Sequence, residues 1–339
     1  MSVSVSGSDP DSLTTSVEER FAVLNVAKPK GMTSHDVVAR VRRVFGLKRV
    51  GHLGTLDPMA EGVLPVCLGR ATRLIEYFPT DKRYRAWVTF GKTTHTLDAE
   101  GEVLTEQSAA HLTEEAVKAQ LAAFTGTFSQ QVPLHAAVRV NGKKLYQYAH
   151  AGRTDVVAPS REVTIHALSL AQWQEAVHSP EANGAEWPTA VLEVHCSSGT
   201  YIRALARDLG EALGTGAYLS RLVRTAHGAF TLDSAVALDA LQQSSSPQNY
   251  LQNPLPFLAL PVLVLADTTR QQALLNGINL PVTEQDGPLK ANQWYLAVNQ
   301  PDVTNPETLL LAVLQHREHR LRPHKVFNVR FAATRMPPD

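Results

Sequence analysis

Apolar residues near the start of the chain recur at spacings that predict a strand, a helix and a second strand. Residues 21–27 form a short, mostly apolar run, as in a buried strand. Valines and a phenylalanine between positions 37 and 45 recur every three or four residues, which predicts an amphipathic helix capped by Ser34 and ended by Gly46. An irregular stretch over residues 51–62 then leads into a second apolar run, residues 63–68, which is expected to be another buried strand.

The rest of the chain mixes strand and helix patterns without a regular rhythm. Strands are expected over 83–90, 164–173 and 189–196, and helices over 71–77, 113–125 and the later part of 199–213. Proline and serine cluster over 244–261, as in a linker, and short strand patterns follow at 294–298, 309–314 and 326–331. This order favours an α+β fold over a doubly wound parallel sheet.

Composition excludes several classes of protein. The 339 residues are 44% hydrophobic and 19% charged, as in an ordinary globular protein of about two domains. Two cysteines, Cys67 and Cys196, are too few for a disulfide scaffold and suggest a reducing compartment. The apolar runs are too short to span a membrane, and the first 20 residues lack the features of a secretory signal. We therefore expect a cytoplasmic protein.

The formal net charge of zero hides an uneven distribution. Residues 21–92 hold thirteen basic and five acidic side chains, a net charge of +8. Such a segment favours contact with phosphates, but it is equally compatible with several solvated helix faces. Charge by itself leaves these two interpretations open.

Three segments carry candidate chemistry. Residues 51–58 (Gly-His-Leu-Gly-Thr-Leu-Asp-Pro) form a glycine-containing loop that would present Asp57 toward a cleft, or else a simple Asp-Pro turn. In residues 197–208, Thr200 is expected to cap a helix whose first turn holds Tyr201 and Arg203, and Arg203 would bind an anion or pair with an acid on the helix surface. In residues 81–85, Tyr84 lies among cations at the start of a strand.

Other functional motifs do not fit. No glycine pattern matches a dinucleotide-binding or P-loop site, and no serine-hydrolase elbow is present. The histidines at 316, 319 and 324 have no cysteine ligands nearby, so we expect no metal. A glycosidase would need a second carboxylate beside Asp57, and Glu61 is the local candidate.

Taken in order, six segments resemble the bacterial tRNA pseudouridine-55 synthases, the TruB family. The resemblance runs from about Val23 to Ala229 and is carried by residues 28–34, 51–58, 61–69, 81–85, 142–146 and 199–203. It implies a pseudouridine synthase fold, a long mixed and mostly antiparallel sheet with flanking helices and a central cleft. It also implies isomerisation of uridine 55 in the T loop of tRNA, without a cofactor.

The resemblance assigns roles to seven residues of this sequence. Asp57 matches the catalytic aspartate, which would attack the sugar or abstract a proton, and Tyr84 matches the tyrosine beside the base. Arg203 matches the arginine that pairs with the catalytic carboxylate. The remaining matches are two residues that line the uracil pocket, a histidine that helps to flip the base and a lysine that supports the cleft: Tyr201, Leu222, His52 and Lys28.

Composition and the resemblance together predict a domain organisation, and the resemblance implies a partner. We expect a disordered tail at 1–20, a catalytic domain at 21–245, a linker at 246–260 and a small RNA-binding domain at 261–335, which is PUA-like in position and size. The partner would be the T arm of tRNA, bound by a monomer with no obligatory protein partner and no membrane. One loop departs from the family, which usually has other residues where this chain has Val132, His135, Ala136 and Arg139.

Two other classes remain open. One is a non-catalytic protein that binds or folds RNA on the same fold, although the presence of Asp57, Tyr84 and Arg203 argues for catalysis. The other is the catalytic subunit of a guide-RNA particle. The acidic start of this chain and its bacterial-type motifs count against the second class.

Overall fold

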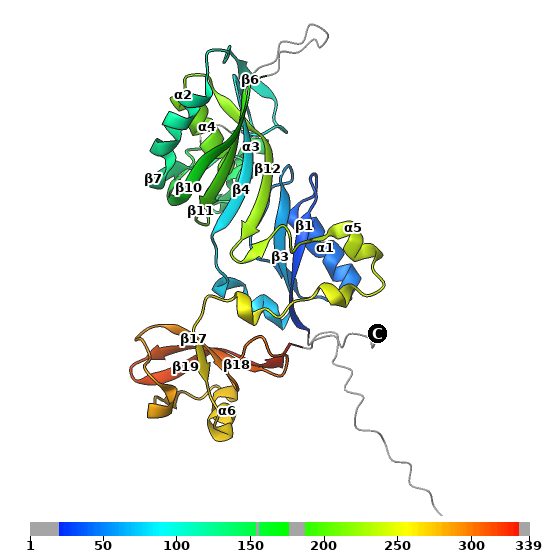
Figure 1. Ribbon diagram of the computed structural model, residues 1–339, viewed down its shortest axis with the longest axis vertical. Helices are drawn as coiled ribbons and strands as arrows, with labels where there is room; N and C mark the ends of the chain where they lie inside the picture. Colours follow the sequence, from blue (N-terminus) through cyan, green and yellow to red (C-terminus); the bar gives the residue numbers. More distant parts are fainter. Residues whose placement is uncertain (1–19, 154–155, 176–186, 332–339) are drawn as a thin grey trace, which may run out of the picture.

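The computed structural model describes residues 20–153, 156–175 and 187–331 (Figure 1). Within these residues, ten strands join in one large sheet and five in a smaller one, and two short hairpins stand apart. The predicted tail over residues 1–20 lies outside the described residues, apart from Arg20. No helix in the described segments has the length and apolar character needed to cross a membrane.

The large sheet is mixed and mostly antiparallel, as expected. Its order is β14–β1–β3–β12–β4–β11–β10–β7, with β2 paired to β3 and β13 to β12. Among the described strands of this sheet, β1–β14 and β3–β12 are parallel pairs. The bounds are β1 Phe21–Lys28, β2 Val50–His52, β3 Glu61–Gly69, β4 Lys82–Phe90, β7 Gly126–Gln131, β10 Ser160–Gln174, β11 Thr189–Cys196, β12 Ala217–His227, β13 Phe230–Thr231 and β14 Val236–Ala237.

Helices cover the two ends of this sheet separately (Figure 1). Near β1 and β3 lie α1 (Ser34–Phe45) and α5 (Leu238–Gln243), and near β10, β11 and β12 lie α2 (Glu114–Leu121) and α4 (Ile202–Ala212). Shorter elements connect them: η2 Arg70–Tyr77, β5 Lys92–Thr94, β6 Val103–Glu106, η3 Ala122–Phe124, β8 Arg139–Val140, β9 Lys143–Lys144, α3 Leu145–His150, η4 Pro247–Tyr250 and η5 Leu255–Phe257.

The N-cap of helix α1 lies one residue before the predicted one. Thr33 is the N-cap: its hydroxyl accepts from the Asp36 N–H (3.1 Å), and the Asp36 carboxylate accepts from the Thr33 N–H (2.9 Å). The prediction that Ser34 caps the helix was therefore wrong, because Thr33 and Asp36 together form the capping box. Gly46 ends the helix in a left-handed conformation, as predicted.

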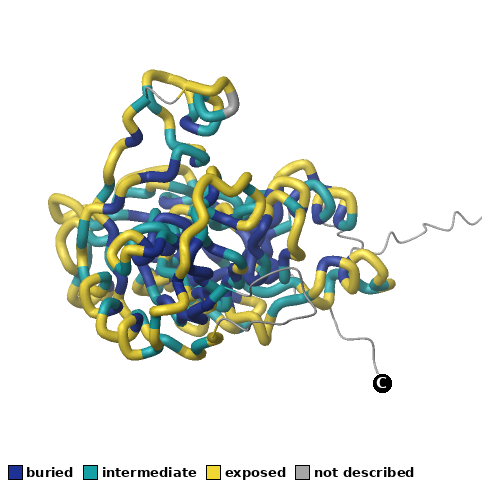
Figure 2. Tube along the Cα trace, turned by 90° about the horizontal axis from the view of Figure 1, so that it is seen from above, coloured by how far each residue is buried: buried dark blue, intermediate teal, exposed yellow. Residues whose placement is uncertain are grey.

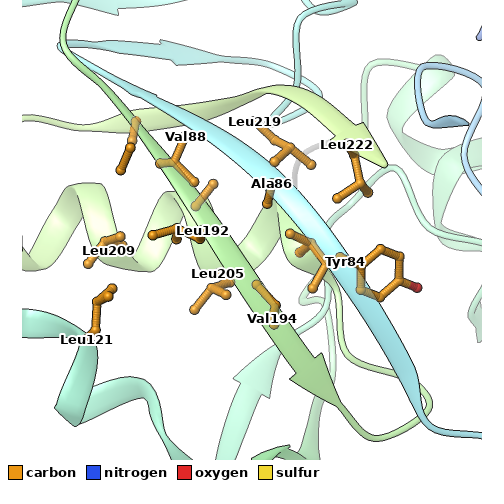
Figure 3. Packing of buried hydrophobic residues seen from close by; sticks show 14 of the residues in the cluster. Tyr84, Ala86, Val88, Leu121, Leu192, Val194, Leu205, Leu209, Leu219 and Leu222 are labelled. Atoms are coloured by element: carbon orange, nitrogen blue, oxygen red, sulfur yellow. The ribbon is translucent and has the colours of Figure 1, made fainter. Parts of the chain in front are cut away.

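Buried residues gather in the middle of the molecule, and exposed residues lie mainly around its outside (Figure 2). The central cluster packs aliphatic residues of β4, β11 and β12 against α4, as Figure 3 shows for Val88, Leu192, Leu209 and Leu219. Tyr84 and Leu222 lie at one end of this cluster. The core therefore supports, at its edge, two of the side chains that were predicted to contact a base.

The smaller sheet lies toward the C-terminal part of the chain and has the order β15–β17–β18–β19–β16, with helix α6 (Thr268–Leu275) beside it. Its bounds are β15 Val262–Val264, β16 Leu280–Pro281, β17 Trp294–Val298, β18 Leu309–Arg317 and β19 Arg320–Arg330, with η6 Glu284–Asp286 before β17. One hydrophobic cluster joins this sheet to the large one, because it contains Phe21 and Val63 as well as Leu310 and Phe327.

Two sequence-based expectations differ from the structure here. Strand β12 was not predicted, although it lies between β3 and β4 in the large sheet. The stretch expected to be a linker packs onto the folded chain, since Leu255 and Leu258 are buried in the shared cluster. Gln252 also pairs with Val23 of β1 through two backbone hydrogen bonds. These residues therefore form an ordered connection between the two sheets.

Candidate active site

The loop between β2 and β3 carries Asp57, and neighbouring elements hold its backbone from two directions. At the start of α1, the Ser34 hydroxyl donates to the Leu56 carbonyl (3.0 Å) and accepts from the Leu56 N–H (2.9 Å). From β12, the Arg224 guanidinium donates to the Gly54 carbonyl (3.1 Å). These bonds fix the backbone on the N-terminal side of Asp57, so its carboxylate stands on a rigid support.

Lys28 lies beneath the same loop at the end of β1. Its side chain is buried, and its ammonium donates to the carbonyls of Pro29 (3.0 Å), Met32 (2.5 Å) and Pro58 (3.3 Å). Burial lowers the pKa of Lys28 to about 8. Lys28 thus ties the end of β1 to the residue that follows Asp57.

Asp57 and Arg203 meet although 146 positions separate them in the chain. The Arg203 Nε donates to Asp57 Oδ2 (2.9 Å), and its two terminal nitrogens donate to the carbonyls of Thr96 (2.9 Å) and His135 (3.1 Å). Asp98 Oδ2 lies 3.7 Å from the same Nε. The Arg203 side chain is only 6% exposed and Asp57 is 37% exposed, so a buried cation orients a carboxylate that remains accessible.

Tyr84 projects from β4 beside this pair and is nearly buried. Figure 3 shows its ring at the end of the aliphatic cluster, with the hydroxyl pointing away from the other side chains drawn there. Burial raises the pKa of Tyr84 to about 12, while interaction with the Arg224 guanidinium acts in the opposite direction. The hydroxyl therefore stays protonated at neutral pH and can donate a hydrogen bond.

A cavity of about 280 Å³ opens at this place. Five of the seven predicted site residues line it: Asp57, Tyr84, Tyr201, Arg203 and Leu222. Its walls combine a carboxylate, a guanidinium, two phenol rings and an aliphatic side chain. Such a mixture suits a flat ring that needs apolar faces and a few polar partners at its edge.

Tyr201 is the N-cap residue of α4, and Gln130 of β7 holds its backbone. The Gln130 amide accepts from the Tyr201 N–H (2.9 Å) and donates to the Tyr201 carbonyl (3.1 Å). The predicted cap by Thr200 was wrong, because the Thr200 hydroxyl donates to the Ser197 carbonyl (3.0 Å) instead. Arg161 lies over the Tyr201 ring, 5.5 Å from its centroid.

The structure places His52 at the end of β2, outside the residues that line the cavity. Its ring packs edge-on against His35 of α1, with centroids 5.7 Å apart. Burial, with the His35 charge as a smaller cause, lowers the pKa of His52. His52 is therefore a largely neutral ring at neutral pH.

Glu61 does not join the site. Both Arg221 Nε (2.8 Å) and Nη2 (2.6 Å) donate to Glu61 Oε1, and neither residue is among those that line the cavity. Among the described residues, no three His, Cys, Asp or Glu side chains gather into a set that could hold a metal. The second carboxylate near Arg203 is Asp98, which the sequence analysis did not single out.

Sequence reasoning also missed Arg224, the most deeply buried of the polar residues around the site. Arg224 is fully buried and donates to the carbonyls of Val63 (2.6 Å), Thr55 (3.3 Å) and Gly54. An arginine in phase with Leu222 on an alternating strand was the available signal, because alternate residues of a strand face the same side.

Comparisons with known proteins agree with this architecture. Residues 42–202 match the model of the TruB family pseudouridylate synthase N-terminal domain, and residues 203–262 match the model of the tRNA pseudouridylate synthase B C-terminal domain. The tRNA pseudouridine synthase B of Acaryochloris marina is 48% identical over 65% of this chain and 73% of its own length. That of Symbiobacterium thermophilum is 50% identical over 65% and 70%.

The fold is also similar to a solved H/ACA RNP bound to a substrate RNA containing 2'-deoxyuridine, with a TM-score of 0.63. That match covers 93% of this chain and 87% of the other at 21% identity, so it concerns the fold alone. Fold and site together define a pseudouridine synthase. The chain belongs to the TruB family, as its motifs predicted.

Proposed function

We propose that this protein isomerises uridine 55 in the T loop of tRNA to pseudouridine, with Asp57 as the catalytic carboxylate. The family membership and the names of the relatives support the reaction and the substrate. The observation that carries the assignment of Asp57 is its 2.9 Å ion pair with the buried Arg203 at the wall of the cavity.

The reaction breaks the C1′–N1 glycosidic bond, turns the uracil and joins C1′ to C5. The C5 proton leaves and N1 gains a proton, so no group is lost and no cofactor is consumed. A carboxylate can serve by attacking C1′ or by removing a proton from the nucleoside. Asp57 suits either role, because Arg203 pairs with Oδ2 of a carboxylate that lines the cavity and remains accessible.

The remaining cavity residues would hold the detached base. Tyr84 and Leu222 lie together at the end of the aliphatic cluster, and they offer a ring face and an apolar surface to a flat base. Tyr201 adds a second aromatic ring to the cavity. The protonated Tyr84 hydroxyl would donate a hydrogen bond or relay a proton.

The target nucleotide must leave its stack to enter this cavity, at a cost of about a few kcal/mol. We propose that His52 assists this step from the neighbouring strand end and that basic residues bind the flanking phosphates. Exposed cations close to His52 in sequence are Arg42, Arg43, Lys48 and Arg49. We further propose a cytoplasmic monomer whose C-terminal sheet, PUA-like in position, contacts tRNA outside the T loop.

The test is to incubate the pure protein with an unmodified T-arm hairpin and to map pseudouridine. We expect product at position 55 without any guide RNA or partner protein. Asp57→Asn should abolish product while RNA affinity stays within a few fold, because phosphate contacts dominate that affinity. Product from a verified Asp57→Asn protein would remove Asp57 from catalysis, and inactivity of the wild type would favour the two alternative classes.

A further inference from the structure

Arg203 depends on two loops that belong to different parts of the chain. Besides the Asp57 carboxylate, it contacts the carbonyl of Thr96, in the hairpin between β5 and β6, and the carbonyl of His135, in the loop between β7 and β8. A guanidinium keeps its orientation only while its acceptors keep theirs. The direction of the Asp57 carboxylate therefore depends on the separation of these two loops.

A side-chain hydrogen bond joins the same two loops. His135 Nε2 lies 3.0 Å from His95 Nδ1, and the two rings meet edge-on with centroids 4.8 Å apart. His95 directly precedes Thr96, and His135 itself supplies the second carbonyl to Arg203. The bond thus lies one residue or less from both of the backbone groups that orient the arginine.

Both ends of this link are anchored. The His95 N–H donates to the Glu102 carbonyl across its hairpin (3.0 Å). On the other side, Ala136 is buried in a small cluster with Val132 and Leu145, so His135 is attached to a packed segment. Because each loop is itself held in place, the bond between them can fix the distance from one loop to the other. Between two mobile loops the same bond could not do so.

We propose that His95 and His135 are a positioning pair. Their hydrogen bond sets the distance between the two carbonyls to which Arg203 donates, and thereby orients the Asp57 carboxylate. This inference rests on the proposed function. His135 stands in the loop whose residues depart from those usual in the family that the motifs resemble. His135 also lines the cavity, whereas His95 is not among the lining residues, so the effect of His95 on the uridine would be indirect.

The pair predicts a loss in rate rather than in binding. Single-turnover isomerisation of the T-arm hairpin should fall about fivefold in His95→Ala and in His135→Ala, the loss expected for one hydrogen bond. RNA affinity should change less than twofold. The double variant should be no slower than the slower of the two single variants, because the bond between the rings is already lost in each of them. Additive losses, or a loss in affinity alone, would overturn the proposal.

Geometry-matched replacements separate positioning from simple packing. His135→Gln keeps a polar group near the former Nε2 position, and His95→Asn keeps one near the former Nδ1 position. These variants should recover most of the wild-type rate, while His135→Asn and His95→Gln, which misplace that group, should not. Equal rates in all four variants would mean that hydrogen-bond geometry is irrelevant. His111→Ala, at an exposed histidine before α2, is the control and should match wild type.

A second readout does not depend on catalysis. Amide hydrogen exchange over residues 132–148 should become about fivefold faster in His95→Ala, a substitution outside that segment, and should return to normal in His95→Asn. Unchanged exchange in His95→Ala would overturn the link between the loops. An inactive wild type with the predicted exchange pattern would instead reject the proposed function and keep the contact.

Discussion

Tyr84 combines two properties that a single substitution can separate. Its ring completes the wall beside Leu222, and its hydroxyl stays protonated because burial raises its pKa to about 12. Tyr84→Phe should keep the ring and the fold but lower single-turnover isomerisation about 100-fold, if the hydroxyl moves or donates a proton. Unchanged RNA affinity with full activity would leave Tyr84 a packing role only.

Arg203 makes three directed bonds with one guanidinium, and a lysine cannot reproduce them. Arg203→Lys keeps the positive charge but would lose contacts to the carbonyls of Thr96 and His135. We expect the rate of isomerisation to fall at least tenfold, with a smaller change in tRNA affinity. Wild-type turnover in the lysine protein would show that charge alone suffices.

The sequence predicted which residues are chemically important more readily than it predicted which of them are in contact in the folded chain. The loop around Asp57 and the helix start near Arg203 were each recognisable, yet each had an ordinary structural explanation. Their ion pair spans 146 positions, so only the resemblance to a family linked them before the structure did. Arg224 was not predicted, because an arginine is usually exposed, whereas this one is fully buried and donates to three backbone carbonyls.

Among the elements, α1 was predictable because its apolar residues keep one spacing through all three turns. Strand β12 was not, for two physical reasons. Its register against β4 shifts after Leu219 and again after Arg224, which breaks the alternation that identifies a strand. Its buried face also includes Arg224, so the polar residues of this segment did not distinguish its exposed face from its buried face.

A buried histidine at the end of β12, beside the loop that carries Asp57, makes the stability of the fold depend on pH. His227 is buried close to Gly54 of that loop, and burial, then Arg224 and Lys82, lower its pKa to about 3. The unfolded chain binds this proton near pH 6.5, so stability is lost as pH falls from about 6.5 toward 3. Denaturant unfolding should show about 2 kcal/mol less stability from this group at pH 5 than at pH 7.

A neutral replacement provides the comparison. His227→Gln should lose most of that pH-dependent difference, because it has no proton to bind, whereas His111→Gln at an exposed site should behave as wild type. The same decline with pH in His227→Gln as in wild type would assign the effect to other groups. Far-ultraviolet circular dichroism at both pH values would verify that each variant is folded.

The whole molecule is held together across its two sheets. Arg73 of η2 donates to the Val326 carbonyl (2.6 Å) and lies over the Phe327 ring, 4.7 Å from its centroid. Lys325 pairs with Glu76 and also donates to the Arg73 carbonyl (2.9 Å). Since the hydrophobic cluster is shared as well, removing residues 255–339 would uncover Phe21 and other core residues of the large sheet. Truncation would therefore be expected to destabilise the remaining chain, so a loss of tRNA binding could not be assigned to lost RNA contacts alone.

A point substitution at the junction is the sharper experiment. Phe327 is fully buried and meets Phe21 edge-on, with centroids 6.1 Å apart. Phe327→Ala should destabilise the protein by about 3–5 kcal/mol, whereas Arg320→Ala, exposed on the same strand, should have little effect.

Because the cluster joins both sheets, wild type should unfold in one transition, with the unfolding curves from tryptophan fluorescence and circular dichroism coinciding. Two separated transitions, with the Phe327 variant shifting only one of them, would show that the C-terminal sheet folds independently of the active site.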